Sequence, residues 1–354
     1  MANIQAATTT TTSVTNLIKS YYERMLLETL DPSTRFYQFG VKKPLPKGEG
    51  TSVIWNRATP LGLGMQLSIG TPTSTANALS TQTVSAVIAQ YGGFTSLSDI
   101  VDMTAITSVM DMAVSRLGQQ AAETRERVIQ NAIIRHASTT NSSAHSFGKT
   151  SASGTIENWG QTSVCADTVS STNVISVSDI RQMVYALKRL NVAPYEGNDF
   201  VSIINTEQAE DLVGDSTWIN FHQYAAPGQV NLYTGEIGKI YGCRFVETNL
   251  GPGSVGSNAG GTASTLAYGA VVFGSGFFGV TELDGGIKMQ GPVTGASKSD
   301  PLNQTTTIGW KMNFTSKILN TSAGLVLWTG SGDTSAAYAE SAGSGLRHED
   351  PTAY

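Results

Sequence analysis

Three glycines form the clearest candidate for binding chemistry in this sequence. Gly274, Gly276 and Gly279 match the G-x-G-x-x-G pattern of dinucleotide-binding sites, and the pattern follows a strand-like run. In those sites a helix begins at the pattern, because its first backbone amides bind the pyrophosphate. Residues 280–286 have no apolar repeat of helical period, and they end in two glycines. We therefore expect no helix at this point and no dinucleotide cofactor.

Two further groups could in principle do chemistry. The run Gly148–Thr150 resembles the end of a phosphate-binding loop, but Ser143 stands where the first glycine of that loop belongs. Asp99 and Asp102 could act as paired carboxylates in acid–base catalysis, whereas their position just before a helix favours turn and cap roles. Neither group predicts an active site.

Histidines and cysteines are few and scattered. The four histidines show no metal-ligand spacing with one another or with a cysteine. His348, Glu349 and Asp350 could bind a metal ion weakly, although a charged tail is the simpler interpretation. Cys243 lies in an alternating, strand-like run, so we expect a small packed side chain rather than a nucleophile. The sequence thus predicts neither a metal site nor catalytic residues, and we do not expect an enzyme.

The composition narrows the classes of function further. Of the 354 residues, 40% are hydrophobic, only 14% are charged and 37 are glycine, which suits β-structure, long loops and large contact surfaces. The formal net charge of -5 argues against a dedicated, strongly basic nucleic-acid-binding protein. The chain opens on no signal-peptide pattern, and no run approaches about 18 consecutive apolar residues, so we expect no membrane partner.

One long segment carries almost no charge. Residues 51–98 contain a single charged side chain, Arg57. Two β-like runs, 52–59 and 80–90, flank a loop rich in glycine and proline, which predicts a long two-stranded hairpin. An exposed apolar hairpin would promote aggregation, so we expect it to lie on another subunit; a lid packed on its own domain is the alternative. The expected inter-subunit contact residues are Trp55, Arg57, Leu63, Met65, Leu67 and Ile69.

The longest helical pattern covers residues 107–136. Its apolar residues keep one stripe at helical spacing, and Thr107 is a plausible N-cap. At 1.5 Å per residue such a helix spans about 45 Å, which suits a structural spine. Its expected polar face consists of Glu123, Arg125, Glu126 and Arg127.

The other elements complete an α+β pattern. An amphipathic helix is expected over 15–29, another over 178–190, and a short one over 207–213 with Thr206 as its cap. Residues 137–176 are expected to be loops with weak strands, and the chain from 330 onwards is expected to be a tail. Strands are expected over 200–204, 267–273, 279–283, 304–315 and 325–328.

Several runs carry a family resemblance. The most specific are DPLNQ at 300–304 with IGWK at 308–311, and NLYTGEIG at 231–238 with RFVET at 244–248. Together with wider matches, these runs resemble the N4-like family of tailed-bacteriophage major capsid proteins. The resemblance thins at 137–176 and after Leu327. The wider matches are residues 21–57, 90–106, 178–191, 218–248, 268–284 and 300–320.

This resemblance implies the major capsid fold shared by tailed phages and herpesviruses, of the Hong Kong ninety-seven type. The expected division begins with an N-terminal arm (1–50) and an extended β-hairpin loop (51–95). A peripheral domain (96–176) contains the spine helix, and an axial domain (177–285) is expected to meet its neighbours at capsomer centres. The chain then returns to the peripheral domain (286–329) and ends in a tail (330–354).

The resemblance also implies function and partners. Copies of the chain would form the pentamers and hexamers of an icosahedral head that encloses packaged double-stranded DNA. A separate scaffolding protein, a portal and a decoration protein are the implied partners, with assembly in the host cytoplasm and a final place in the virion capsid. A β-rich tail, fibre or surface-layer protein fits the composition equally well, but the long helix and the DPLNQ and IGWK runs favour the capsid protein.

Charge and lysine placement add two expectations. Residues 1–60 carry seven basic and four acidic side chains, a net charge of +3, which leaves -8 for the rest. Some relatives join subunits covalently through a lysine of the extended loop and an asparagine elsewhere. Residues 51–98 contain no lysine, so we expect no such crosslink.

Overall fold

A computed structural model describes most of the chain. The described residues are 34–59, 61, 78–104, 108–139, 146–149, 156–158, 173–224, 236–257, 264–293, 295 and 301–330. The helix expected over 15–29, the tip of the hairpin and the tail after 330 lie outside these residues. The described elements mix helices and strands, as the α+β prediction requires.

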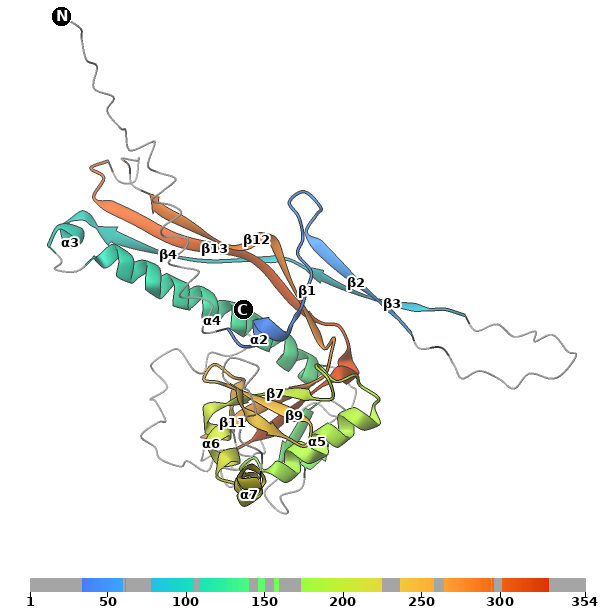
Figure 1. Ribbon diagram of the computed structural model, residues 1–354. Coiled ribbons are helices and arrows are strands. Elements are labelled where there is room, and N and C mark those ends of the chain that lie inside the picture. Colours follow the sequence, from blue (N-terminus) through green and yellow to red (C-terminus); the bar gives the residue numbers. More distant parts are fainter. Residues whose placement is uncertain are drawn as a thin grey trace, which may run out of the picture.

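Two lobes are visible in Figure 1, an elongated one and a compact one, with a hairpin projecting beyond them. The elongated lobe contains a four-stranded sheet in the order β1-β12-β13-β4. Its strands β12 and β13 are long and antiparallel to each other, and β4 pairs antiparallel with β13 along its whole length. The bounds are β1 Val41–Lys42, β4 Ala89–Ser98, β12 Phe278–Val293 and β13 Thr305–Ile318.

A long helix, α4 (Val109–Thr139), runs along this sheet and confirms the predicted spine helix. The Ser108 hydroxyl accepts a hydrogen bond from the Asp111 amide at 3.3 Å, so Ser108 rather than Thr107 caps the helix. The short helix α3 (Asp99–Thr104) precedes α4. In the core between α4 and the sheet, Trp310 donates from its indole nitrogen to the Gln120 amide oxygen at 3.0 Å.

The compact lobe is built on an eight-stranded sheet. The strand order is β6-β5-β14-β11-β7-β9-β8, and β10 pairs with β11. Most pairs are antiparallel, but β7 runs parallel to β9 and β14 runs parallel to β5. The bounds are β5 Ser146–Lys149, β6 Ile156–Asn158, β7 Phe200–Asn205, β8 Glu236–Ile240, β9 Cys243–Thr248, β10 Gly253–Ser257, β11 Ser264–Phe273 and β14 Gly324–Thr329.

Both faces of this sheet are buried. One face packs against α5 (Val177–Arg189), α6 (Thr206–Val213) and α7 (Ser216–Tyr224) in a single apolar cluster. Side chains of the other face, such as Val271 and Trp328, join the core that includes α4 and the four-stranded sheet. Strands buried on both faces read as continuous apolar runs, which is why Phe200–Asn205 could be predicted as a strand.

Capping side chains fix the beginnings of α5 and α6. Ser176 and Asp179 form a reciprocal capping box at α5, as the acidic first turn suggested. At α6 the box is formed by Asn205 and Gln208, so the expected cap at Thr206 is wrong by one residue. Thr206 is the first helical residue, because Asn205 ends β7 in an extended conformation.

The predicted hairpin is confirmed in its described part. Strands β2 (Ser52–Ala58) and β3 (Thr81–Val87) pair antiparallel from Ser52 opposite Val87 to Ala58 opposite Thr81. Only Ile88 separates β3 from β4, so the second strand of the hairpin leads directly into the sheet of the elongated lobe. Figure 1 shows the hairpin leaving the body at the end of β12 and β13.

Candidate subunit-contact site

Trp55 attaches the hairpin to its own chain. The indole lies over Gly279 of β12, where an added Cβ would sit 3.1 Å from Trp55 Cε2 and from Leu319 Cδ1. Gly279 therefore leaves the space that the ring occupies. Trp55 Nε1 is buried without a hydrogen-bond partner in the described part of the chain. These contacts place Trp55 against its own subunit, and a contact with another subunit remains a prediction for this residue.

Polar contacts secure the same root of the hairpin. Arg57 Nη1 donates to Asn320 Oδ1 at 2.6 Å, across the end of β13. Lys43 Nζ donates to the Ile54 carbonyl at 2.6 Å and joins the hairpin to the segment after β1. Arg57, the only charged residue of segment 51–98, thus binds within its own subunit. Both contacts lie at exposed positions, so each contributes only modestly to stability.

Apolar side chains are exposed beyond this root. Ile54 is 49% exposed and Val87 69% exposed on the two paired strands. Leu61 and Leu79, where the strands give way to the loop, are 55% and 72% exposed. Leu63, Met65, Leu67 and Ile69 lie outside the described residues, so their contacts stay a prediction. The described part of the hairpin has no hydrophobic core of its own. Its stability therefore depends on the contacts at its root.

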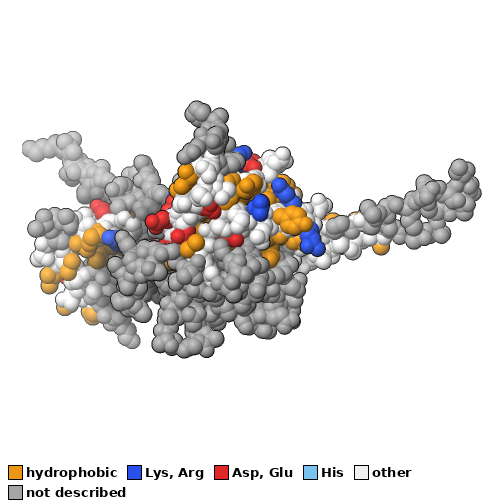
Figure 2. Space-filling model, turned by 90° about the horizontal axis from the view of Figure 1, so that it is seen from below, with side chains coloured by type: hydrophobic (Ala, Val, Ile, Leu, Met, Phe, Trp, Pro, Cys, Tyr) orange, Lys and Arg blue, Asp and Glu red, His pale blue; other side chains and the backbone are white. Residues whose placement is uncertain are grey.

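A second exposed apolar region lies at the far end of the elongated lobe. Hydrophobic side chains gather on the left in Figure 2, where Figure 1 places α3 and the start of α4. An exposed cluster of this kind marks a contact surface more often than a free one. The exposed apolar residues of α3 and the start of α4 include Ile100, Met103 and Met112, which are 57% to 80% exposed.

The segment before β1 is fastened to the spine helix by a buried carboxylate. Glu126 of α4 accepts hydrogen bonds from the backbone amides of Phe36 at 3.0 Å and Tyr37 at 3.3 Å. These amides open the short helix α2 (Phe36–Phe39), whose Phe36 and Phe39 side chains are buried in the core. Burial raises the pKa of Glu126 to about 7, although the two amides, Arg125 and Arg35 act in the opposite direction.

Arg125 completes this attachment. Its guanidinium lies 3.9 Å from the centre of the Tyr37 ring and donates to the Thr34 hydroxyl at 3.1 Å. It also forms an ion pair with Glu282 of β12 at 3.7 Å. Arg125 and Glu126 are 5% and 1% exposed, so the predicted polar face is wrong for these two residues. Four charges within five positions cover too much of a helix surface for all of them to face water.

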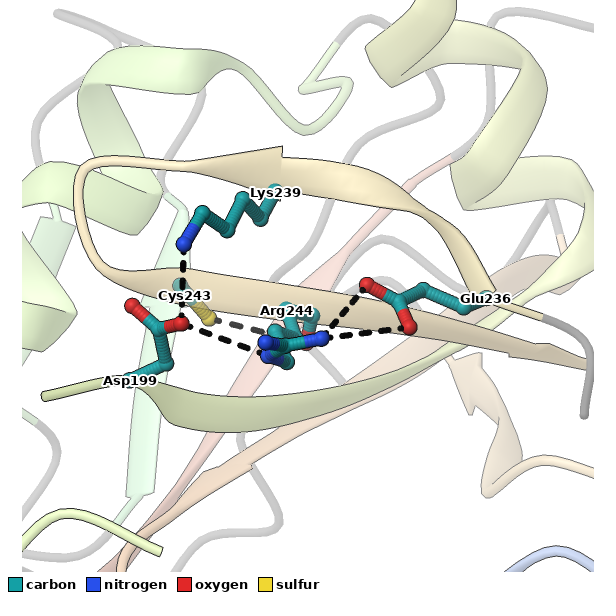
Figure 3. A network of polar contacts seen from close by, with 5 residues as sticks. All are labelled: Asp199, Glu236, Lys239, Cys243 and Arg244. Carbon is teal, nitrogen blue, oxygen red and sulfur yellow. Dashed lines mark hydrogen bonds and ion pairs between the residues drawn. The ribbon is translucent and has the colours of Figure 1, made fainter. Parts of the chain in front are cut away.

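A charge network closes one edge of the compact lobe (Figure 3). Asp199, just before β7, accepts from Lys239 Nζ of β8 at 3.1 Å and from Arg244 Nε of β9 at 3.3 Å. Arg244 Nη1 also lies 3.3 Å from Glu236 Oε1 of β8. Two cations and two carboxylates thus neutralise each other within the subunit. Burial raises the pKa of the neighbouring Cys243 thiol, which agrees with the packed role expected for it.

The candidate chemical motifs do not assemble a reactive centre in the described residues. The G-x-G-x-x-G run spans the turn from β11 to β12, with Gly279 inside β12, so a strand follows it rather than a helix. Lys149, which belongs to the run that resembled the end of a phosphate-binding loop, is the last residue of strand β5. No cluster of three or more histidine, cysteine, aspartate or glutamate side chains in the described ranges could hold a metal ion. None of the described helices is long and apolar enough to cross a membrane.

Comparisons with known proteins agree with this architecture. A family model described as phage capsid protein matches residues 81–327. The capsid structure of cyanophage P-SCSP1u is similar with a TM-score of 0.60 and 19% identity, covering 85% of this chain and 89% of that one. The capsid of Ralstonia phage GP4 gives a TM-score of 0.64 and 13% identity, with coverages of 86% and 93%. Among curated proteins, none matches this chain.

Proposed function

Because the chain belongs to the phage capsid protein family and functions as a major capsid protein, we propose that its copies form pentamers and hexamers of an icosahedral head around double-stranded DNA. The observation that carries the proposal is the hairpin β2–β3, which is fixed at its root and exposes apolar side chains beyond it. The protein works by association, and no step of catalysis is required of it.

The hairpin supplies the proposed contact with a neighbouring subunit. Its root is held by Trp55 and Arg57, so the direction in which it leaves the body is set before assembly. A preorganised element loses less conformational entropy on binding than a free loop does. Each ~100 Å² of apolar surface that it covers contributes about 2.5 kcal/mol before ordering costs. The proposed contact residues beyond the root are Leu63, Met65, Leu67 and Ile69.

We assign the lobes to the domains that the sequence resemblance implied. The elongated lobe with α4 corresponds to the peripheral domain, and the compact lobe corresponds to the axial domain. The described hairpin is the extended loop, and the segment held by Glu126 is the end of the N-terminal arm. The N4-like subtype of the family is part of the same proposal and rests on the DPLNQ, IGWK and NLYTGEIG runs.

Further partners follow from the proposed role. A head that is filled with DNA needs a portal, and a shell of this family implies a separate scaffolding protein during assembly in the host cytoplasm. A decoration protein is a further proposed partner on the finished virion. The net charge of -5 gives no strong attraction for phosphate, so we do not expect the interior of the shell to bind DNA tightly.

Replacing the hairpin tip tests the proposal. Thr59 and Ser80 are hydrogen-bonded across the hairpin, so residues 60–79 can be replaced by the two-residue turn Asn-Gly without changing the register of β2 and β3. We expect the shortened chain to fold with an unchanged thermal midpoint but to form no closed shells by electron microscopy. The full chain under the same conditions is expected to form capsomers or shells.

A second variant keeps the full length of the hairpin and removes only its apolar side chains. Exchanging only the four tip residues Leu63, Met65, Leu67 and Ile69 for serine should also prevent assembly, since the apolar contact is lost while the loop remains. Normal shells from both variants would remove the hairpin from the assembly mechanism. Rods or flat lattices from the full chain would instead favour a tail or surface-layer protein.

A further inference from the structure

Helix α5 carries a basic face that no described residue neutralises. Arg181, Tyr185 and Arg189 are spaced by four residues, so they form one stripe along the helix. Both arginines and the adjacent Lys188 are exposed, and Tyr185 and Leu190 are 66% and 44% exposed. None of the three cations forms an ion pair within the described part of the chain. The one acidic residue of α5, Asp179, is buried in the capping box.

Helix α6 carries the opposite charge. Its eight residues include Glu207, Glu210 and Asp211 and contain no lysine or arginine. Glu210 is exposed, and the other two are half-buried. Exposed apolar side chains accompany this acidic face as well: Val213 at the end of α6 is 42% exposed and Ile219 of α7 is 45% exposed. Each helix therefore combines one sign of charge with apolar area, as protein interfaces do.

The basic face of α5 and the acidic face of α6 belong to the same layer of helices but lie apart from each other. Both helices cover one face of the eight-stranded sheet, and Figure 1 places α6 and α5 towards opposite sides of that layer. Figure 2 shows red side chains towards the α6 side and blue and orange ones over the α5 side. The charges around Arg244 pair with one another, so they add little to the charge of either helix face.

We propose that the basic face of α5 in one subunit binds the acidic face of α6 in the next subunit of the same capsomer. The inference rests on the proposed function, since it needs copies arranged in a ring. Two different, complementary faces on one subunit produce a heterologous contact, and copies joined in this way form a ring where the rotation between neighbours closes. The same pair of faces therefore serves both pentamers and hexamers, and opposite charges fix the direction in which the ring runs.

Charge reversal tests the contact. The basic-face variant carries Arg181→Glu and Arg189→Glu, and the acidic-face variant carries Glu210→Lys and Asp211→Lys. Each variant places like charges across every contact of a ring, so the concentration needed for capsomers should rise by about tenfold or more. The readouts are native mass spectrometry for capsomers and electron microscopy for shells.

Two combinations of these variants make the test sharper. A chain with all four substitutions again has complementary faces, so it should recover capsomers and shells; a folding defect from any substitution would persist in it. A mixture of the two variants can only alternate around a ring. It should therefore form hexamers but not pentamers, because a ring of five cannot alternate, and hence no closed icosahedral shell.

The outcomes separate this inference from the proposed function. Shells from either single variant at the concentration of the full chain would overturn the pairing of α5 with α6, as would failure of the folded four-substitution chain to recover. Intact shells that lose their nucleic acid in the basic-face variant alone would assign α5 to DNA and likewise overturn it. Absence of capsomers and shells from the full chain itself would count against the proposed function.

Discussion

Glu126 shows how one side chain can fix a segment that is distant in the sequence. Its carboxylate binds two backbone amides of α2, and the aromatic rings next to those amides enter the core. The chain is thereby fixed to the spine helix at Phe36 and Tyr37. The ionised carboxylate is costly in this buried position, which is why burial raises its pKa to about 7 from an ordinary value of 4.5.

This shift predicts a pH dependence of stability. Between pH 4.5 and 7 the folded chain retains a proton on Glu126 that the unfolded chain releases. The free energy of unfolding should therefore fall as the pH rises through this window, by up to about 3 kcal/mol from this group. In Glu126→Gln this contribution is absent, so its unfolding free energy should depend less on pH than that of the native chain.

Urea unfolding at pH 5 and pH 8 measures this difference. Other carboxylates and histidines titrate in both proteins, so only the difference between the two pH profiles reports on Glu126. Parallel profiles would show that the carboxylate is ionised throughout and that its hydrogen bonds outweigh its burial.

At the scale of single residues, the sequence indicates which side chains make contacts better than it indicates their partners. The hydrophobic character of Trp55 indicated a contact, and the structure places that contact within the subunit, over Gly279. Arg125 and Glu126 were expected to face water with their neighbours in the same run. Their partners Thr34, Phe36 and Tyr37 lie about ninety positions earlier, and local periodicity contains no information on such distant pairs.

Among the elements, α6 depends on one buried side chain. Gln208 accepts from the Asn205 amide at 3.3 Å and donates to the Tyr268 carbonyl at 3.0 Å and to the Thr329 hydroxyl at 2.7 Å. It thus caps the helix and joins it to β11 and β14 at the same time. A helix of eight residues is too short to be stable alone, so it relies on such contacts.

Removal of this side chain should destabilise the compact lobe. Gln208→Ala loses three hydrogen bonds and opens a small cavity, and we expect a loss of about 2 to 4 kcal/mol in the free energy of unfolding. Glu210→Ala, two residues further along the same helix and exposed, serves as the control and should change it by less than about 0.5 kcal/mol. Equal effects of the two substitutions, measured by urea unfolding, would contradict this account of α6.

The elements themselves were largely predictable, but their assembly was not. Apolar periodicity located α4 and α5, and continuous apolar runs located β7 and β14. The parallel pairing of β7 with β9, and of β1 with β12, joins segments separated by other elements. Pairing of this kind depends on the geometry of the whole sheet, and alternating strand patterns are compatible with many partners.

On the scale of the whole molecule, the hairpin offers no lysine for a covalent link to a neighbouring subunit. The absence of lysine from residues 51–98 predicts particles held together without isopeptide crosslinks. Particles that are denatured and analysed by intact mass spectrometry should give single chains of at most 37.3 kDa. Masses at two or more times this value, persisting after reduction, would contradict the prediction.

The direct passage from β3 into β4 has a mechanical consequence. A neighbour that pulls on the hairpin loads β4 along its own length, and β4 is held to β13 from Ala89 to Ser98. All the hydrogen bonds of that ladder then resist the force together, in shear, whereas a strand peeled from its end would yield one bond at a time. Tension on the hairpin of an assembled subunit would thus spread along the sheet that α4 supports.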